Sequence, residues 1–400
     1  MNIESCGLIS HVSGKDGGMK HFKRMQTFKA RGEESCFVWG PRQTGKTTLL
    51  FELFPKSPRY NLLLASEARR LATEPSFLRQ ELLAMPPGRI PVVIDEVQKV
   101  PELLDEVQAL IVENHMQFVL CGSSARKLKR QGSNLLGGRA LRFELFPLVF
   151  PEIPDFDLLR ALNHGLLPRH YISDKPKELL EAYVGEYLKE EVVAEALVRN
   201  VPAFSRFLEV AAFSNGEVVN YSNIASECGV SHPTIKEYFQ ILVDTLLARF
   251  VPSFRKKPKR RIIESPKFYY FDVGLPNFLL KREKIVPKAE LFGRAFEHFI
   301  FQELIAHSHY SGIKYPISYW RTTSQFEVDF ILGDHEVALE IKGVNKVDAH
   351  HLKGLQAFSE EYQTKHSIVV SMEERPRKIG HILILPWQVF LHRLWSHELI

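Results

Sequence analysis

The chain has 400 residues, of which 45% are hydrophobic and 25% are charged, and this composition excludes general disorder. At roughly 100–200 residues per domain, the length predicts two to four domains. The 52 Lys and Arg residues exceed the 47 Asp and Glu residues, giving a net charge of +5. That excess is too small to indicate a polyanionic partner by itself.

The cysteines and the apolar runs exclude further classes of protein. The four cysteines lie far apart and include no CxxC pair, so we predict neither a zinc cluster nor a disulfide framework. A reducing compartment is expected. No apolar run approaches the roughly 20 residues that span a bilayer, and the amino-terminal segment contains no apolar signal core. We therefore expect a cytoplasmic protein without a membrane partner.

The amino-terminal part alternates short apolar runs with helical patterns. Residues 1–18 have little periodicity and predict a flexible tail. From Cys36 onward, strands are expected in SCFVWG, IPVVIDEV, QFVLCGSS and LRFELF, with helices between them. This alternation predicts a parallel, doubly wound sheet. We place this α/β domain at residues 19–155 and end it in the proline-rich segment FPLVFPEIPDFD.

Two further domains are expected. Residues 156–284 predict a mostly helical domain, in which two helices meet at a turn at Gly229 and a hairpin follows. Ser231 is the expected N-cap of the second helix, and Pro233 lies in its first turn. Residues 285–400 return to α/β character, with an amphipathic helix followed by the strands ISYW, FEVDFIL, EVALEIKG and HSIVV.

A phosphate-binding loop follows the first expected strand. Its residues match GxxxxGK[ST] and lie between an apolar strand and a helix, where such a loop must lie. Backbone N–H groups of the curled loop and the helix N-terminus attract phosphate oxygens. Lys46 is expected to reach the β- and γ-phosphates of ATP, and the Thr47 hydroxyl is expected to bind Mg²⁺. The residues expected to contact nucleotide are Gly40, Pro41, Arg42, Gln43, Thr44, Gly45, Lys46, Thr47 and Thr48.

Paired acids lie at the end of the second expected strand. Asp95 and Glu96 directly follow the apolar residues of PVVI. In an open α/β sheet, ligands bind at the carboxyl ends of the strands. Asp95 is therefore expected to hold Mg²⁺, and Glu96 is expected to orient or deprotonate the attacking water. An exposed acidic turn is the alternative, and the phosphate loop upstream favours the catalytic interpretation.

Polar groups downstream complete the candidate catalytic set. Ser123 and Ser124 follow the strand QFVLCG, where a polar side chain can touch the γ-phosphate or the water. Arg139 is a candidate for adding positive charge to the transition state, either within its own subunit or across to a neighbour. A structural salt bridge is the alternative role for Arg139, and Arg126 is its nearby competitor.

Six motifs follow one another along the chain: GPRQTGKTTLL, VVIDEVQKVPELL, VLCGSSARKL, LLGGRALRFELFPLVFPE, SPKFYYFDVGL and EVDFIL. Motifs like these occur in the same order in a large prokaryotic family of predicted AAA+ ATPases, which this chain resembles. The resemblance covers nearly all of residues 22–370. It implies an ATPase module, a winged-helix-like middle domain and a C-terminal domain of unknown function that is similar to PD-(D/E)xK nucleases. The chain departs from the family at Asn61–Glu67, where it has NLLLASE and members often carry an acidic residue near the start.

The middle domain has the spacing of a helix-turn-helix, with Ser231–Leu246 as its candidate recognition helix. The loop RKKPKRR at residues 255–261 lies where a winged helix places its hairpin wing. Lysines and arginines there can contact DNA phosphates without reading the sequence. Two alternatives stand beside DNA contact. The loop can be merely solvated, or the winged helix can serve as a protein-interaction or packing module.

Four charged residues of the C-terminal domain match the PD-(D/E)xK pattern. Glu297 lies on the helix, Asp329 on one strand, and Glu340 and Lys342 two residues apart on the next. The resemblance implies that the acids hold Mg²⁺ or Mn²⁺ and that the lysine steadies the nucleophile. Three carboxylates against one lysine leave excess negative charge, which suits such a cation. A buried ion-pair network and an inactive binding platform are the alternatives, and Gln356 is a further candidate contact.

Together these patterns predict a Mg²⁺-dependent ATPase that hydrolyses ATP to ADP and phosphate and is coupled to winged-helix-like and nuclease-like modules. One alternative is an ATP-gated, metal-dependent DNA nuclease. Another is a nucleotide-controlled scaffold or regulator without nuclease activity. If Arg139 acts on a neighbouring subunit, the protein must form a homo-oligomer.

Overall fold

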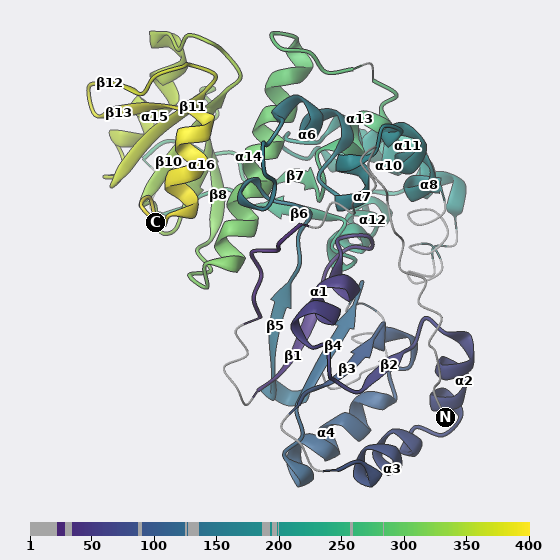
Figure 1. The fold of residues 1–400 in the computed structure, drawn as a ribbon. Helices are drawn as coiled ribbons and strands as arrows, with labels where there is room; N and C mark the ends of the chain where they lie inside the picture. Colours follow the sequence, from purple (N-terminus) through teal and green to yellow (C-terminus); the bar gives the residue numbers. More distant parts are fainter. Residues whose placement is uncertain are drawn as a thin grey trace.

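The structure, a computed structural model, describes most of the chain. The described residues are 22–28, 34–86, 90–124, 126, 136–185, 193, 198, 200–256, 259–282 and 284–400. The tail expected at residues 1–18 and Lys257 of the basic loop lie outside this part. Figure 1 shows a lower body built on one sheet and an upper body that contains the remaining elements. No helix in the described part combines the length and the apolar character that crossing a membrane requires.

The lower body is a five-stranded sheet with helices around it. Its strands lie in the order β2-β3-β4-β1-β5, and every neighbouring pair is parallel. The strands are β1 (Ser35–Trp39), β2 (Arg59–Asn61), β3 (Val92–Asp95), β4 (Phe118–Gly122) and β5 (Ala140–Glu144). The helices are α1 (Lys46–Leu53), α2 (Ala65–Thr73), α3 (Ser76–Ala84) and α4 (Leu103–Asn114). The predicted parallel α/β fold is confirmed.

The central strands of this sheet are buried on both faces. Every residue of β1, β3 and β4 is buried, which is typical of parallel strands covered by helices on two sides. Phe37 and Leu120 pack on the face that α4 covers, whereas Val38 and Val119 pack on the face that α1 covers. The sequence-based expectations omit β2, because only one of its three residues, Tyr60, is buried and the apolar signal is weak.

The middle segment is helical, as predicted, and carries one hairpin. Its helices are α6 (Leu158–His164), α7 (Pro168–Ile172), α8 (Pro176–Ala182), α10 (Val201–Phe213), α11 (Tyr221–Cys228), α12 (His232–Asp244) and α13 (Gly274–Leu279). The hairpin strands β6 (Ala248–Val251) and β7 (Lys267–Tyr270) pair antiparallel. The Ser231 hydroxyl accepts a hydrogen bond from the Thr234 N–H at 3.3 Å, and Gly229 ends α11 with a φ of 66°. The predicted cap and turn are confirmed.

The carboxyl-terminal segment is a six-stranded mixed sheet, in the order β12-β13-β11-β10-β9-β8. The strands are β8 (Ile317–Arg321), β9 (Glu327–Leu332), β10 (Val337–Lys342), β11 (His366–Ser371), β12 (Arg377–Ile379) and β13 (Ile382–Pro386). The helices are α14 (Glu290–Tyr310), α15 (Lys353–Ser359) and α16 (Trp387–Trp395). Helices α14 and α16 pack on one face and α15 packs on the other. The four predicted strands and the predicted helix are confirmed, and β12, β13 and α16 are additional.

The proline-rich segment after β5 is part of the upper body's core. Leu148 shares a hydrophobic cluster with α6 and α14. The Phe150 N–H donates to Glu303 Oε1 on α14 at 2.8 Å, and Trp395 Nε1 donates to Glu303 Oε2 at 2.8 Å. Glu303 is fully buried, and burial raises the pKa of its carboxyl group to about 8. One acid therefore ties the segment after β5 to α14 and α16.

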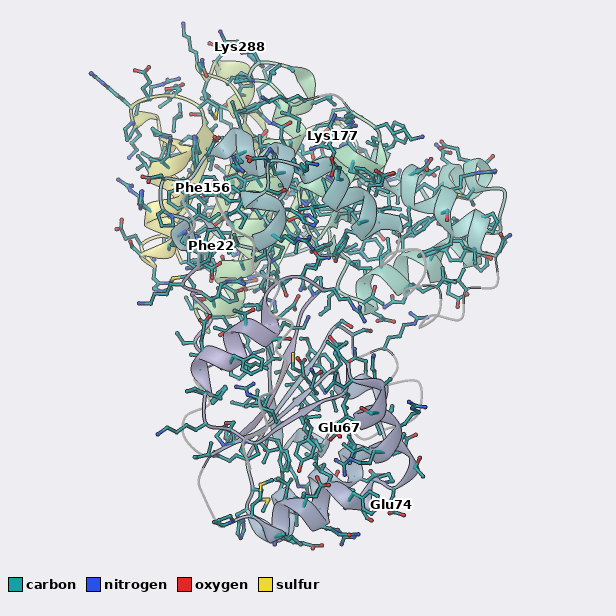
Figure 2. The ribbon with its side chains drawn as sticks, turned by 45° about the vertical axis from the view of Figure 1, so that its right-hand side comes forward. Phe22, Glu67, Glu74, Phe156, Lys177 and Lys288 are labelled. Atoms are coloured by element: carbon teal, nitrogen blue, oxygen red, sulfur yellow. The ribbon has the colours of Figure 1, made fainter. Side chains whose placement is uncertain are left out.

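Aromatic side chains extend this core toward the amino terminus. Phe156 stacks on Phe299 of α14 with ring centroids 5.3 Å apart. Phe22 meets the Tyr171 ring of α7 edge-on at 6.5 Å. Figure 2 labels Phe22 and Phe156 in this region. The chain ahead of β1 therefore contacts the upper body before it enters the lower sheet.

Replacing Glu303 with glutamine should make the stability of the upper body less dependent on pH. The folded Glu303 stays protonated up to about pH 8, whereas the ordinary pKa is 4.5. Between these values the folded chain binds more protons than the unfolded chain, so the free energy of unfolding falls as pH rises, by about 1.4 kcal/mol per unit. Thermal unfolding of wild type and Glu303→Gln at pH 5 and pH 8 measures this. At pH 8 the Glu303→Gln variant should gain thermal stability relative to wild type, and the exposed Glu209→Gln variant should not. An equal difference at both pH values would contradict the assignment.

Candidate functional site

The phosphate loop lies between β1 and α1, at the carboxyl edge of the lower sheet. Gly45 precedes α1 with a φ of 92°, a left-handed value that favours glycine. A β-carbon on Gly40 would lie 2.4 Å from the Leu145 carbonyl oxygen, so a larger residue does not fit. The buried Lys46 donates from Nζ to the carbonyl oxygens of Gly40 at 2.7 Å and Pro41 at 3.0 Å. The lysine therefore lies within the curl of the loop.

The other polar residues of the loop differ in exposure. Thr44 is buried, and its hydroxyl donates to the Pro41 carbonyl at 2.9 Å. Arg42 is half-buried, whereas Gln43 and Thr48 are exposed. Gln43 has a φ of 63°, so the loop turns through a left-handed residue that is not glycine.

Thr47 and Asp95 meet at the edge of the sheet. The Thr47 hydroxyl donates to Asp95 Oδ2 at 2.7 Å, which joins the first turn of α1 to the end of β3. Asp95 Oδ1 accepts from the Glu96 N–H at 3.0 Å, and Asp95 is buried. A hydroxyl and a carboxylate oxygen side by side are the kind of ligands that Mg²⁺ takes. The donor set therefore fits Mg²⁺, with Thr47 and Asp95 as the residues that would hold it.

Gln98, a residue that the sequence does not single out, connects Glu96 and Ser123. Both are buried, at the ends of β3 and β4. Gln98 Nε2 donates to Glu96 Oε2 and also to Ser123 Oγ, the latter at 2.9 Å. The sequence gives no local sign of this contact, because a glutamine in a short turn after a strand is usually exposed.

Ser124 and Arg126 face the middle segment. Arg126 Nη1 donates to Asp244 Oδ2 at 2.8 Å, and the Ser124 hydroxyl donates to the Asp244 carbonyl at 3.4 Å. Asp244 is the last residue of α12. The suggested role of Ser124 at the γ-phosphate, and of Arg126 as a competitor of Arg139, is therefore not supported. These residues contact the end of the candidate recognition helix.

Arg139 lies at the opposite edge of the sheet from the phosphate loop. It directly precedes β5, and Ala140 pairs with Ser35 at the beginning of β1, whereas the loop follows Trp39 at the other end. Four residues of strand separate the two edges by about 13 Å. Arg139 is exposed. Within one chain, therefore, the arginine is not placed at its own phosphate loop, and a catalytic role would have to be exerted on a neighbouring subunit.

Arg24 is a second residue that the sequence analysis misses. Its side chain is 5% exposed and donates to the Thr44 carbonyl of the phosphate loop at 2.5 Å. It also donates to the Phe146 carbonyl at 2.7 Å and to Glu152 Oε2 at 2.9 Å. The only sequence signal is a basic stretch that also suits a solvated tail. Arg24 connects the phosphate loop to the segment that follows β5.

Three family models match successive parts of the chain. Residues 155–285 match one described as Domain of unknown function (DUF8612), and residues 292–390 match one described as Domain of unknown function (DUF4143). Residues 33–154 match the AAA domain. The AAA domain contains the phosphate loop, the paired acids and Ser123, and the match supports ATPase activity for this part of the chain. The description of the C-terminal match names no function, so the likeness to nucleases stays a prediction.

Similar proteins occur in bacteria and archaea. An uncharacterized protein of Mycobacterium tuberculosis is 25% identical over 314 residues, which cover 76% of this chain and 69% of that protein. An uncharacterized protein of Methanocaldococcus jannaschii is 25% identical over 345 residues, which cover 77% and 75%. The solved structure of a Walker-type ATPase of Pyrococcus abyssi matches 61% of this chain and 90% of its own, at 14% identity and a TM-score of 0.39. A TM-score this low does not establish a shared fold.

The four charged residues predicted at the C-terminal site do lie together. Lys342 Nζ lies 2.6 Å from Glu340 Oε1 and 3.7 Å from Asp329 Oδ2. Asp329 Oδ2 also accepts from the Ile341 N–H at 2.7 Å. Glu297 joins them from α14 through Lys267, whose Nζ lies close to Glu297 Oε1. The predicted constellation therefore forms, with two further members that the sequence does not single out, Lys267 and Glu327.

Lys267 is a second lysine of the C-terminal cluster. This lysine of β7 is 2% exposed, and its Nζ lies 3.3 Å from Glu297 Oε1, 2.7 Å from Glu327 Oε1 and 3.7 Å from Asp329 Oδ1. The expected three carboxylates against one lysine are in fact four carboxylates against two lysines, so the formal excess of two negative charges is unchanged. Burial alone would lower the pKa of Lys267, but Glu297 and the other acids raise it well above its usual value. The buried ion-pair network therefore has more members than predicted, at the same formal net charge.

The acids of the cluster differ in their affinity for a proton. Burial raises the pKa of Glu340 to about 8, and the nearby Asp329 carboxylate adds to the effect. Burial alone would also raise the pKa of Asp329, but Lys342 and Lys267 hold it below its usual value. Glu340 Oε2 is buried and has no hydrogen-bond partner in the described part of the chain. Gln356 lies exposed on α15.

The basic loop is engaged with the C-terminal domain. Arg260 contacts Glu360 and lies 2.6 Å from Glu361 Oε1 at its Nη1. Lys256 contacts Asp334, also in the C-terminal domain. Arg255 lies 3.4 Å from Glu264. DNA contact by this loop therefore stays a prediction, and several of the charges of the loop already face acids of the same chain.

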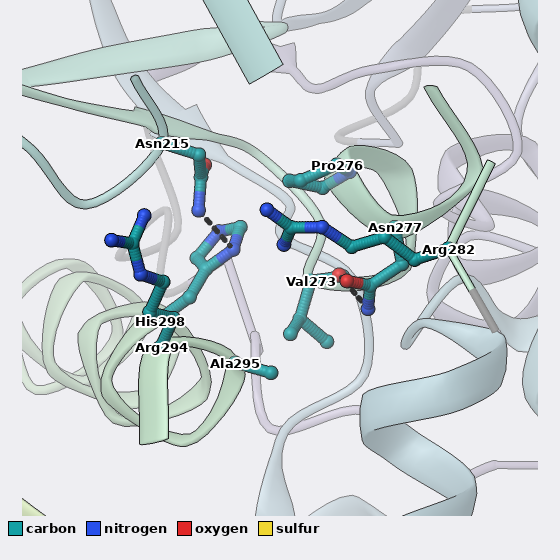
Figure 3. Close-up of a pocket in the computed structure, with 8 residues that line it drawn as sticks. All are labelled: Asn215, Val273, Pro276, Asn277, Arg282, Arg294, Ala295 and His298. Carbon is teal, nitrogen blue, oxygen red and sulfur yellow. Dashed lines mark hydrogen bonds between the residues drawn. The ribbon is translucent and has the colours of Figure 1, made fainter. Parts of the chain in front are cut away.

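A small pocket lies between the middle segment and α14. Its lining residues are Asn215, Val273, Pro276, Asn277, Arg282, Arg294, Ala295 and His298 (Figure 3). The His298 ring meets Asn215 Nδ2 at 3.2 Å and the Tyr270 carbonyl at 2.7 Å, so both of its nitrogens have partners. Asn277 Nδ2 donates to the Leu162 carbonyl at 3.1 Å. The two contacts of His298 join α14 to the middle segment, whereas the Asn277 contact lies within that segment.

Proposed function

We propose that the chain is an ATPase whose AAA domain hydrolyses ATP to ADP and phosphate with Mg²⁺. The observation that carries this proposal is the hydrogen bond between Thr47 and Asp95, next to the phosphate loop. This hydrogen bond joins the two residues that would hold Mg²⁺. Thr47 follows β1 through the phosphate loop, and Asp95 ends β3. An accidental glycine turn would not have this buried carboxylate beside the hydroxyl of its final residue.

The residues of the site divide the work of hydrolysis. Lys46 and the N–H groups of the loop bind the β- and γ-phosphates, and Mg²⁺ supplies positive charge at the same oxygens. Glu96 orients a water molecule toward the γ-phosphorus and accepts its proton. The bond from the γ-phosphorus to the bridging oxygen breaks, and ADP carries that electron pair away. Ser123 would contact the γ-phosphate or the water.

Release of phosphate from ATP by the purified full chain tests the proposal. Wild type should release phosphate with Mg²⁺ and not with EDTA, and Asp95→Asn should lose most of the rate because it loses the charge beside Thr47. The exposed Asp105→Asn is the matched control and should retain the rate. Equal rates for wild type and Asp95→Asn would contradict the proposal.

A homo-oligomer follows from the proposal if Arg139 takes part. Arg139 is exposed and lies about 13 Å of strand away from its own loop. An arginine so placed adds charge to a transition state only in a neighbouring subunit. Mixing Arg139→Ala with Lys46→Ala chains should then restore some activity, because the two defects lie on opposite sides of a shared site.

A second candidate function is divalent-cation binding at the C-terminal cluster, on which the proposed nuclease activity depends. Its supporting observation is Glu340 Oε2, a buried carboxylate oxygen without a described partner. A cation bridging Glu340 and Asp329 would satisfy this oxygen. Lys267 opposes it, because its ammonium group already lies among Glu297, Glu327 and Asp329. The basic loop adds no support for DNA contact. A nucleotide-controlled scaffold without cleavage is therefore the closer alternative.

Replacing Lys267 with methionine should raise the affinity of the full chain for Mn²⁺ by at least tenfold. The change removes a buried positive charge that competes with a cation for Glu297, Glu327 and Asp329. Calorimetric titration measures the affinity, and Lys365→Met, at an exposed position, is the control. Asp329→Ala should abolish binding. If neither wild type nor a folded Lys267→Met variant binds Mn²⁺, these residues are an ion-pair cluster only, and the nuclease alternative is contradicted.

A further inference from the structure

Gln98 lies where three strands of the AAA domain end. It belongs to the 3₁₀ turn Val97–Lys99 that follows Glu96, and it is 2% exposed. Its Nε2 uses one proton to bond Glu96 Oε2 and the other to bond Ser123 Oγ at 2.9 Å. One amide group therefore joins the candidate base at the end of β3 to the candidate γ-phosphate contact at the end of β4.

The amide is held in one orientation by its surroundings. Gln98 Oε1 is buried and accepts no hydrogen bond from any described residue. It lies against Gly122, because a β-carbon there would come within 2.4 Å of Gln98 Oε1 and 2.6 Å of Trp39 Cζ3. The reversed amide would turn its oxygen toward the Glu96 carboxylate, which repels it. The glutamine therefore gives up a hydrogen bond at Oε1 and keeps both donors on Glu96 and Ser123.

Glu96 needs such a partner. Its backbone has a φ of 56°, a left-handed value that is uncommon for glutamate. Its side chain has three rotatable bonds, so the carboxylate can take several positions around a water molecule. General-base catalysis requires the acceptor within hydrogen-bond reach of the water, and small displacements are costly in rate. A fixed donor beside the carboxylate restricts it to one position.

We propose that Gln98 is a positioning residue for ATP hydrolysis, which holds Glu96 and Ser123 in one hydrogen-bonded group. The proposal rests on the proposed ATPase function and adds two residues to it. Gln98 acts through Glu96 and does not touch the nucleotide. Gly122 acts through Gln98, because the absence of its β-carbon leaves room for the amide.

Replacing Gln98 with methionine should lower kcat at least tenfold and leave KM for ATP within about twofold. Methionine has a similar length and no amide donor, so the phosphate loop is left intact while Glu96 loses its partner. Gly122→Ala should give the same pattern, since the added carbon displaces the amide. Gln302→Met removes two buried hydrogen bonds of α14, far from the nucleotide site, and should leave kcat and KM unchanged.

A double variant separates positioning from general loss of structure. Single-turnover rates with radiolabelled ATP should differ much less than tenfold between Glu96→Gln and Glu96→Gln with Gln98→Met, because the larger part of the effect of Gln98 is exerted through Glu96 and the contact with Ser123 adds the smaller part. A further tenfold loss of the single-turnover rate in the double variant, relative to Glu96→Gln, would overturn the proposal. A raised KM with unchanged kcat in Gln98→Met would also overturn it. If wild type hydrolyses ATP and Gln98→Met is fully active, the positioning role of Gln98 is overturned and the ATPase proposal is not. A wild type without turnover would overturn the ATPase as well.

Discussion

Replacing Lys46 with alanine should lower the affinity of the chain for ATP at least tenfold. The buried ammonium group lies within the curl of the phosphate loop, on the carbonyls of Gly40 and Pro41. It is therefore close enough to exchange those carbonyls for phosphate oxygens. Losing a charge-assisted hydrogen bond costs roughly 1.5–3 kcal/mol, and each 1.4 kcal/mol is a factor of ten in affinity.

Calorimetry with Mg²⁺ and ATP measures this affinity. Lys56→Ala, which removes an exposed lysine just after α1, is the matched control and should bind ATP as wild type does. Both variants should melt near the wild-type temperature if they fold. Equal ATP affinity for wild type and a folded Lys46→Ala would contradict the assignment of this loop as the site that binds the phosphates of ATP.

Replacing Glu96 with glutamine should reduce kcat by a factor of about 100 or more. Glutamine keeps the shape of the side chain and loses the negative charge that orients and deprotonates the water. ATP affinity should stay within about twofold of wild type, because Lys46, Thr47 and Asp95 are unchanged. A mutation that lowers kcat without raising KM marks an interaction that acts in the transition state.

Steady-state phosphate release measures kcat, and the exposed Glu113→Gln of α4 is the control. An undiminished rate in Glu96→Gln would show that another group activates the water. A lost rate that comes with lost ATP binding would instead indicate a structural role for Glu96, at the turn where its backbone is left-handed.

The sequence predicts the phosphate loop and the paired acids well, because their signals are local. A glycine motif must lie between a strand and a helix, and an acid that ends a buried apolar run must lie at the sheet edge. The parallel sheet itself follows from alternating strands and helices. The sequence does not predict strand β2, because an edge strand of three residues with one buried side chain has almost no periodicity.

Side-chain partners from distant segments could not be predicted in the same way. Arg24 and Thr44 become neighbours only because the segment ahead of β1 returns beneath the loop. Gln98 looks like any polar residue of a turn until β4 is known to end beside it. Such contacts depend on the tertiary arrangement and leave no repeat in the sequence.

Lys267 did leave a signal. It is the single charged residue at the start of the strand KFYY, whose other residues are apolar or aromatic. A lysine buried in such a strand must find carboxylates, so the charge count at the C-terminal cluster needed this residue as well. Arg139 shows the opposite case. Its motif suggests a catalytic arginine, but the direction of β5 places it at the wrong edge for its own site.

The structure of the Glu96→Gln variant with ATP and Mg²⁺ bound tests the proposed site most directly. Lys46 Nζ should have left the Gly40 and Pro41 carbonyls for the β- and γ-phosphates. Mg²⁺ should lie against the Thr47 hydroxyl, with Asp95 beside it directly or through water. ATP bound elsewhere, or Mg²⁺ held without Thr47 and Asp95, would contradict the proposal that this loop and these strand ends form an ATPase site.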